Sequence, residues 1–221
     1  MARVSFRPVP FVTSLVLAGL GAPSVHAHFL WMYFDTPTSG GAKVVFAESP
    51  GNSVLPNLVG KRAQFLLVQP AGLVGWGDEY GAVPADGGDV ALGKLPYGVM
   101  TKRGGFLLMY YARATRDAVA AAGPSSLPLD LLLTRDGEFV QLQVLFRGEP
   151  RAGAKIQAYD AAFRPITATA DAEGRARLRW PANRPFFGWA STDEKRPGTF
   201  NGKAYPFVRH YTSLSVSTSG K

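Results

Sequence analysis

Two histidines, His28 and His210, have the clearest potential for chemistry in this chain. His28 directly follows Val25-His26-Ala27, a small-residue sequence of the kind that signal peptidase cleaves. If cleavage follows Ala27, the mature protein begins with His28, and this one residue offers two metal-binding nitrogens, its α-amine and its imidazole. His210 is the only other histidine in that mature chain. Together the two residues predict a three-nitrogen clamp, often called a histidine brace, that holds one metal ion in a partly open site.

Nitrogen ligands of this kind suit copper(II) and nickel(II), and they also accept cobalt and zinc. Copper binds most tightly to almost any such site, so the preference of the isolated protein does not identify the metal that it carries in the cell. The α-amine must lose its proton to bind, and its reference pKa is about 7.7–8.0. We therefore expect the metal affinity to rise with pH through that range.

Two carboxylates are candidates for a further ligand. Glu48 is the first, because it ends a predicted strand and precedes the rigid turn Ser49-Pro50, where a side chain can face a cleft. Asp35 is the second, because it closely follows the strand that begins at His28. The phenol of Tyr211, next to His210, is a less favoured axial ligand.

The first 27 residues have the three zones of a secretory signal peptide. Arg3 and Arg7 precede an apolar run at residues 11–20, and the small-residue exit follows at residues 25–27. We expect residues 1–27 to be removed and the mature protein to be periplasmic or secreted. The apolar run is shorter than the roughly 20 residues that span a bilayer, so the mature protein is not expected to cross a membrane.

Composition excludes several classes of site. The chain contains no cysteine, which excludes disulfides, thiolate zinc sites, iron–sulfur clusters and thiol nucleophiles. The net charge is +8, and it becomes +6 (22 basic against 16 acidic residues) once Arg3 and Arg7 are removed. The basic residues are scattered and form no run typical of nucleic-acid binding. We interpret them as a solubility charge rather than as a surface for an anionic envelope polymer.

Apolar and polar residues alternate with period two through most of the chain, which favours strands over helices. Strands are expected at residues 28–34, 43–48, 62–69, 105–113, 128–134, 140–144, 156–159, 166–170, 176–180, 186–191 and 211–217. One short helix is expected at residues 115–122, before the stop signal Gly123-Pro124. The glycine-rich stretch 72–105 lacks a phosphate-binding motif and is expected to form a long loop.

These elements predict a mainly β protein built from antiparallel β-sandwich domains. The turn Arg135-Asp136-Gly137 is the expected boundary between an N-terminal β-rich domain, residues 28–136, and a C-terminal β-sandwich domain, residues 137–221. The short, closely spaced strands of the second domain suggest an immunoglobulin-like or transthyretin-like sandwich.

The segments 144–150, 154–159 and 171–176 follow a pattern that is common in exported β-sandwiches. With the mature start His28-Phe29-Leu30-Trp31 and the closing His210-Tyr211-Thr212-Ser213-Leu214, the chain resembles the DUF4198 family, exported proteins grouped as domain of unknown function 4198. Members are commonly described as periplasmic components of nickel or cobalt uptake systems. The resemblance implies metal capture and delivery to a membrane transporter. Many members begin with His-Asp-Phe-Trp, and this chain lacks the acidic second residue.

The leading hypothesis is a periplasmic transition-metal-binding protein that is not an enzyme. A metal-free adhesion or scaffold module is the first alternative, with the C-terminal sandwich as its working part. A copper mono-oxygenase acting on a polysaccharide is the second, since such enzymes also use an amino-terminal histidine. They usually present exposed aromatic residues, whereas Trp180 and Trp189 lie in alternating strands and are expected in the core.

Other catalytic arrangements have little support in the sequence. A serine-histidine-acid triad would need His210 as its base, and no Gly-x-Ser-x-Gly elbow is present. Asp78-Glu79 and Asp193-Glu194 are adjacent carboxylates, but neighbouring side chains of an extended chain point apart. They are therefore expected to be solvated loop charges rather than an acid/base pair.

Overall fold

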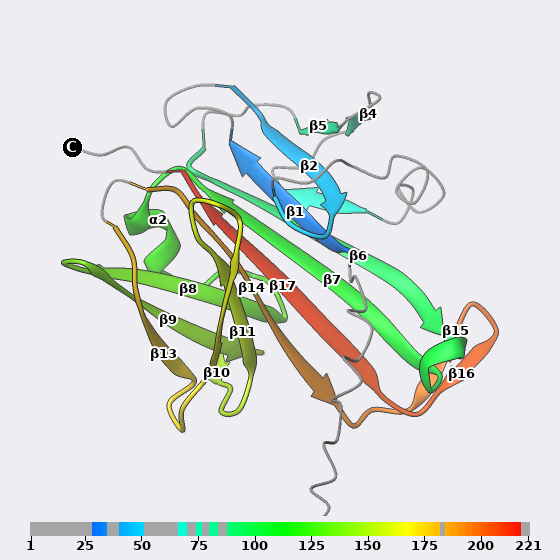
Figure 1. Cartoon of the computed structure of the whole chain (residues 1–221). Helices are drawn as coiled ribbons and strands as arrows, with labels where there is room; N and C mark the ends of the chain where they lie inside the picture. The colour runs from blue at the N-terminus through cyan, green and yellow to red at the C-terminus, as the bar shows by residue number, and fades with distance from the viewer. Residues whose placement is uncertain are drawn as a thin grey trace, which may run out of the picture.

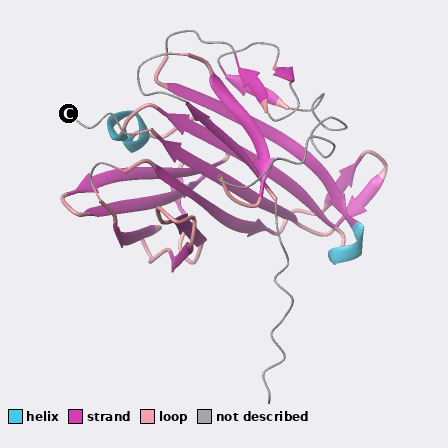
Figure 2. Ribbon diagram, turned by 45° about the horizontal axis from the view of Figure 1, so that its top comes forward, coloured by secondary structure: helices cyan, strands magenta, loops and turns pink. Residues whose placement is uncertain are grey.

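The computed structural model describes residues 28–34, 40–50, 66–69, 74–76, 80–83, 88–181 and 184–217. It confirms the predicted mainly β fold: nearly all regular elements are strands, and their pairing is mostly antiparallel (Figures 1 and 2). In the described part of the chain, no helix combines the length and the apolar character needed to cross a bilayer.

A seven-stranded sheet forms the middle layer. Its strands, in spatial order, are β12 (Pro165–Thr169), β11 (Lys155–Tyr159), β14 (Phe186–Glu194), β17 (Val208–Val216), β7 (Phe106–Thr115), β6 (Val90–Met100) and β3 (Leu67–Gln69). Neighbours are antiparallel except for β17 and β7, which run parallel. The boundary expected at residues 136 and 137 thus separates strands that belong to one sheet.

A second sheet covers one face of this layer. It contains β1 (Phe29–Phe34), β2 (Ala42–Ala47), β5 (Gly81–Val83) and β4 (Gly75–Trp76), drawn above the long strands in Figure 1. β1 is almost fully buried along its length. The Ser213 hydroxyl of β17 donates a hydrogen bond to the Leu30 carbonyl oxygen at 2.6 Å, which fixes β1 along the middle of the large sheet.

A third sheet covers the opposite face. It contains β8 (Leu129–Asp136), β9 (Phe139–Phe146), β13 (Arg175–Arg179) and β10 (Glu149–Pro150). In β9 the buried residues Val140, Leu142 and Val144 alternate with half-buried ones, which is the pattern of a strand with one face in the core. They pack against Leu214 of β17 and its neighbours. A separate hairpin, β15 (Gly198–Phe200) and β16 (Lys203–Tyr205), lies at the end of the molecule.

The short helix α2 (Ala118–Ala122) is held by hydrogen bonds to the side chains of Asp117 and Arg113. The Asp117 side chain caps its first turn by accepting a hydrogen bond from the Ala120 amide at 2.8 Å. Arg113 of β7 donates to the carbonyl oxygens of Ala120 at 2.6 Å and Gly123 at 2.8 Å, so the carbonyls at the helix end have a partner. The helix expected at residues 115–122 therefore exists but begins later, because residues up to Thr115 belong to β7.

The prediction of a long loop at residues 72–105 is wrong for much of that stretch. The stretch contains β4, β5 and the eleven-residue strand β6. The glycines and the proline of β6 lie inside the strand. A Cβ at Gly93 would come within 2.7 Å of the Met32 sulfur, so close packing of β1 requires a glycine there. The strand pairing also shifts register between Pro96 and Gly98, which has a φ of +123°.

Candidate functional site

His210 lies near the start of β17 and is buried, with a side chain that is only 3% exposed. It faces the third sheet, together with Leu214 and Val216 of the same strand. The imidazole stacks on the Tyr111 ring, with ring centroids 5.9 Å apart, and meets the edge of Phe146 at 5.1 Å. His210 is thus in phase with the buried apolar residues of its strand.

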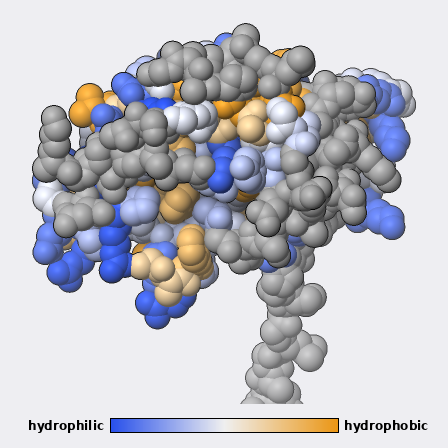
Figure 3. All heavy atoms as spheres, turned by 90° about the horizontal axis from the view of Figure 1, so that it is seen from above, coloured by the Kyte–Doolittle hydropathy of each residue, from blue (hydrophilic) through white to orange (hydrophobic). Residues whose placement is uncertain are grey.

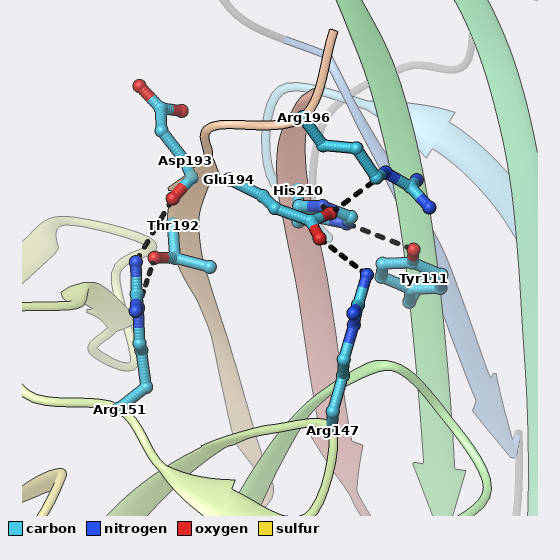
Figure 4. Close-up of polar contacts among 8 residues, drawn as sticks. All are labelled: Tyr111, Arg147, Arg151, Thr192, Asp193, Glu194, Arg196 and His210. Atoms are coloured by element: carbon cyan, nitrogen blue, oxygen red, sulfur yellow. Dashed lines mark hydrogen bonds and ion pairs between the residues drawn. The ribbon is translucent and has the colours of Figure 1, made fainter. Parts of the chain in front are cut away.

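Both ring nitrogens of His210 have a partner (Figure 4). Nδ1 lies 3.0 Å from the Tyr111 hydroxyl oxygen, and Nε2 lies 3.2 Å from Glu194 Oε2. An ionised carboxylate only accepts hydrogen bonds, so Nε2 carries the proton toward Glu194. In the neutral ring Nδ1 then accepts the Tyr111 proton, and a continuous chain runs from tyrosine through histidine to glutamate.

Burial keeps this chain neutral at its tyrosine and histidine members. Burial lowers the pKa of His210 below its usual value, and the hydrogen bond to Glu194 opposes the shift only in part. The nearby Arg196 and Arg147 lower this pKa further. Burial also strongly raises the pKa of Tyr111, so its hydroxyl remains a donor at neutral pH.

Glu194 is the centre of a charged network. Its side chain is 15% exposed and contacts Nη2 of Arg147 at 2.5 Å, Nε of Arg196 at 3.3 Å and His210. Figure 4 shows the two arginines reaching Glu194 from opposite sides. The expectation that residues 193 and 194 lie in a loop is wrong, because both belong to β14. Asp193 is solvated as expected, with a side chain that is 48% exposed, whereas Glu194 is not. The expectation that they point apart is confirmed: Asp193 pairs instead with Arg209 at 2.7 Å.

A cleft of about 380 Å³ opens above this network. Its lining includes His210 and Tyr111, the cationic side chains of Lys94, Arg147 and Arg196, and an uncharged wall formed by Met109 and residues 125–128. Tyr111, Arg147 and Arg196 were not predicted from the sequence as site residues. No local pattern marks them, because they approach His210 only through pairing and packing of strands that are distant in the sequence.

No protein-family model, curated protein or solved structure matches the chain. Its function must therefore be argued from the geometry of its own residues.

His28 lies on the other side of the large sheet. Its half-buried ring stacks on Phe46 of β2 at 5.9 Å. The Phe46 ring meets the edge of Tyr110 at 5.3 Å. Tyr110 and Tyr111 are neighbours on β7, so their side chains project to opposite faces of the sheet. The structure thus does not bring His28 and His210 together, because the aromatic residues that contact them lie on opposite faces of β7.

Glu48, in contrast, follows directly after β2, the strand that pairs with β1. β1 and β2 are antiparallel, with Phe29 opposite Ala47, so the same register continued by one pair sets His28 opposite Glu48. Side chains directly opposite each other share a face, with Cβ atoms about 4.5–5.5 Å apart. The Tyr159 hydroxyl donates to the Glu48 carbonyl oxygen at 3.0 Å and fixes the backbone at this point. Asp35 lies outside the described residues.

Side chains alone do not complete a metal site in the described ranges, where no group of three histidine, aspartate or glutamate residues is close enough to hold an ion. At the His28 corner the third donor would be the α-amine that cleavage after Ala27 creates. This amine, the imidazole and the Glu48 carboxylate would form a set of two nitrogens and one oxygen, which suits nickel(II), copper(II) and cobalt(II).

Three of the four tryptophans give no exposed stacking surface. All four lie in the described part of the chain, and Trp31 and Trp180 are buried while Trp189 is half-buried. The core position expected for Trp180 is confirmed, and Trp189 stacks on Phe29 at 4.8 Å. Only Trp76 is exposed, at 39%. The space-filling view in Figure 3 shows hydrophobic patches next to hydrophilic ones rather than one continuous apolar face.

Proposed function

We propose that the protein is a periplasmic carrier of a divalent transition metal, nickel, cobalt or copper, which it binds at an amino-terminal His28. The ligands are the α-amine and imidazole of His28 and the carboxylate of Glu48. The metal is cargo for a membrane transporter, as the resemblance to the DUF4198 family implies. His210 is not part of this ligand set, and Asp35 stays a prediction for a further ligand.

The single observation that carries the proposal is the register of the first hairpin, which ends with Phe29 opposite Ala47 and, continued by one pair, would set His28 opposite Glu48. The ring of His28 rests on Phe46, and Phe46 stacks on Tyr97 at 5.5 Å, so the imidazole is held against a rigid aromatic surface. A ligand with few remaining rotamers loses less entropy when it binds a metal. Three donors leave further positions on the ion open, which favours transfer to a partner.

The other functions considered have less support. A mono-oxygenase that acts on a polysaccharide would need exposed aromatic residues near the metal, and the residues beside His28 pack inward instead, with Trp31 and Phe46 fully or almost fully buried. A metal-free scaffold would need no free α-amine at His28. Blocking that amine should therefore impair a metal carrier but leave a metal-free scaffold unaffected.

The test uses protein that begins at His28, verified by mass, titrated with nickel(II), cobalt(II) and copper(II). A second protein carries one alanine before His28, which removes the α-amine from the chelate but leaves the imidazole. We expect binding of one metal per chain, and we expect it to weaken at least about tenfold in the extended protein, as for loss of a ligand. Equal affinity of the two proteins would refute the proposal and favour the scaffold.

Two substitutions test the ligand set. Glu48→Gln should weaken binding, whereas Glu138→Gln should not, because Glu138 is an exposed carboxylate paired with Arg179 in the third sheet. His210→Asn should leave the metal affinity unchanged when the variant remains folded, as judged by circular dichroism. Loss of metal binding in this variant would restore His210 to the site and contradict the proposed set.

A further inference from the structure

The cleft beside His210 has a strongly cationic lining. Lys94 from β6, Arg147 from the β9–β10 turn and Arg196 from the segment after β14 all line it. The cleft lining includes no acidic residue, and within the described chain Glu194 is the carboxylate paired with its two arginines. With His210 neutral, three positive charges face one negative charge. This imbalance favours an anion in the cleft.

The arginines keep donors available for such an anion. Glu194 contacts Nη2 of Arg147 and Nε of Arg196, while each guanidinium carries five N–H donors. Both side chains are about half exposed, at 55% for Arg147 and 52% for Arg196. A guanidinium positioned by one carboxylate presents its other N–H groups in a fixed plane, which matches the two oxygens of a second carboxylate.

The backbone at Arg147 gives independent support. Arg147 has a φ of +56° and Gly148 a φ of +84°, and they connect Phe146 to its partner Glu149 in a two-residue turn. Both central residues of such a turn are left-handed, a conformation that favours asparagine, aspartate or glycine and strains arginine. The Arg147 amide also donates to the Pro128 carbonyl oxygen at 2.7 Å, which ties the turn to the cleft wall. A strained arginine that is fixed in place and lines a cleft indicates a function for its side chain.

Part of the cleft lining is apolar. Met109, Leu127 and Pro128 contribute to it. A neighbouring hollow of about 320 Å³ shares Lys94, Ser126 and Leu127 with the cleft and adds Leu67 and Leu92. Leu67 is 66% exposed, so its side chain offers apolar surface to a ligand in this hollow. A ligand that fills both hollows would have a charged head and an apolar body.

From these observations we propose that the cleft binds a small organic acid, with its carboxylate between Arg147 and Arg196 and its hydrocarbon body against Leu127 and Leu92. The site is separate from the proposed metal site, on the opposite face of the seven-stranded sheet. Combined hollows of this size fall in the range typical of small-molecule sites, about 300–1,000 Å³.

Isothermal titration of the metal-free protein with octanoate tests this proposal, with octanol and acetate as comparison ligands. We expect octanoate to bind one per chain. Octanol lacks the charge and acetate lacks the chain, so both should bind at least about tenfold more weakly. No octanoate binding, or equal binding of octanol, would overturn the proposal. Equal binding of acetate would overturn the assignment of the apolar body.

Three variants assign the head group. Arg196→Gln should weaken octanoate binding about tenfold or more, as for loss of a charge-assisted hydrogen bond. Arg177→Gln is the matched control, because Arg177 is 56% exposed and pairs with Asp136 at 2.9 Å. Arg177 belongs to the third sheet and does not line the cleft. Arg147→Gly removes the guanidinium, so the variant should bind octanoate more weakly. Because glycine also relieves the left-handed strain at this position, the variant should not unfold at a lower temperature. If Arg196→Gln and Arg147→Gly bind octanoate as the control does, the carboxylate does not lie between them.

Discussion

Removal of one buried charge should destabilise the wall of the cleft. Asp130 and Arg113 form an ion pair with side chains only 3% exposed, at N–O distances of 3.2 and 3.3 Å. The same aspartate accepts a hydrogen bond from the Ser125 amide at 2.6 Å, and the same arginine holds the carbonyl oxygens at the end of α2. Asp130→Asn keeps the shape and one acceptor but leaves the Arg113 charge without a counter-ion.

The magnitude follows from this burial. Breaking a buried pair by neutralising one partner costs about 3–5 kcal/mol, and the retained amide oxygen favours the lower end of that range. Such a loss is a large fraction of the typical 5–15 kcal/mol for unfolding of a domain, and about 3 kcal/mol would lower the ratio of folded to unfolded molecules by roughly two orders of magnitude. Because residues 125–128 lie between α2 and β8 and line the cleft, we expect their amides to exchange hydrogen faster as well.

Urea unfolding followed by the fluorescence of the buried Trp31 and Trp180 measures the change. Asp136→Asn is the matched control, because this aspartate pairs with Arg177 at the surface with a side chain that is 71% exposed. An exposed pair contributes at most about 1 kcal/mol. If the two variants lose the same free energy of unfolding, water reaches Arg113 and the reasoning from burial is refuted.

Two further predictions concern His210 and the turn at Gly174. The pKa of His210 is lower in the folded protein than the value of about 6.5 expected in the unfolded chain. At pH values between these two, the unfolded chain binds more protons than the folded protein. The free energy of unfolding should therefore fall as the pH drops below about 6.5. Urea unfolding at pH 7.5 and 5.5 measures this loss; His210→Asn should reduce the pH dependence, and an unchanged slope would assign it to another group. Gly174→Ala should cost more than about 1 kcal/mol, because Gly174 has a φ of +72° and a Cβ there would lie 2.7 Å from the Val144 carbonyl oxygen and 2.8 Å from the Arg151 amide nitrogen. A melting temperature equal to that of the unsubstituted protein would show that the turn can move.

The strands that could be predicted from the sequence are those with one face in the core. The alternation at residues 140–144 predicted β9, and the structure extends it to Phe139–Phe146. β6 was missed because its glycines and Pro96 are typical of loops, while their cause is tertiary: Gly93 lies under Met32, and the strand bulges after Pro96. Packing against another sheet overrides local propensity at such positions.

The residues around His210 could not be identified from local pattern. Glu194 reaches His210 because β14 pairs with β17, with Thr192 opposite His210, and Tyr111 reaches it because β7 runs parallel to β17. The pairing of Tyr111 with His210 spans 99 residues. A parallel pair has no connecting hairpin turn that would mark it in the sequence.

The separation of the two histidines depends on a single step along β17. Side chains of a strand alternate between faces, so His210 faces Tyr111 and the third sheet, while Tyr211 faces β1 and meets the Phe29 ring at 5.2 Å. A histidine at position 211 would have shared a face with the mature amino terminus. Because β17 is covered by a sheet on each side, its residues are buried or half-buried throughout, and apolar alternation does not reveal which face is which. The sequence could therefore show that His210 shares a face with Thr212, Leu214 and Val216. It could not show which sheet packs on that face, and that sheet decides the partners of His210.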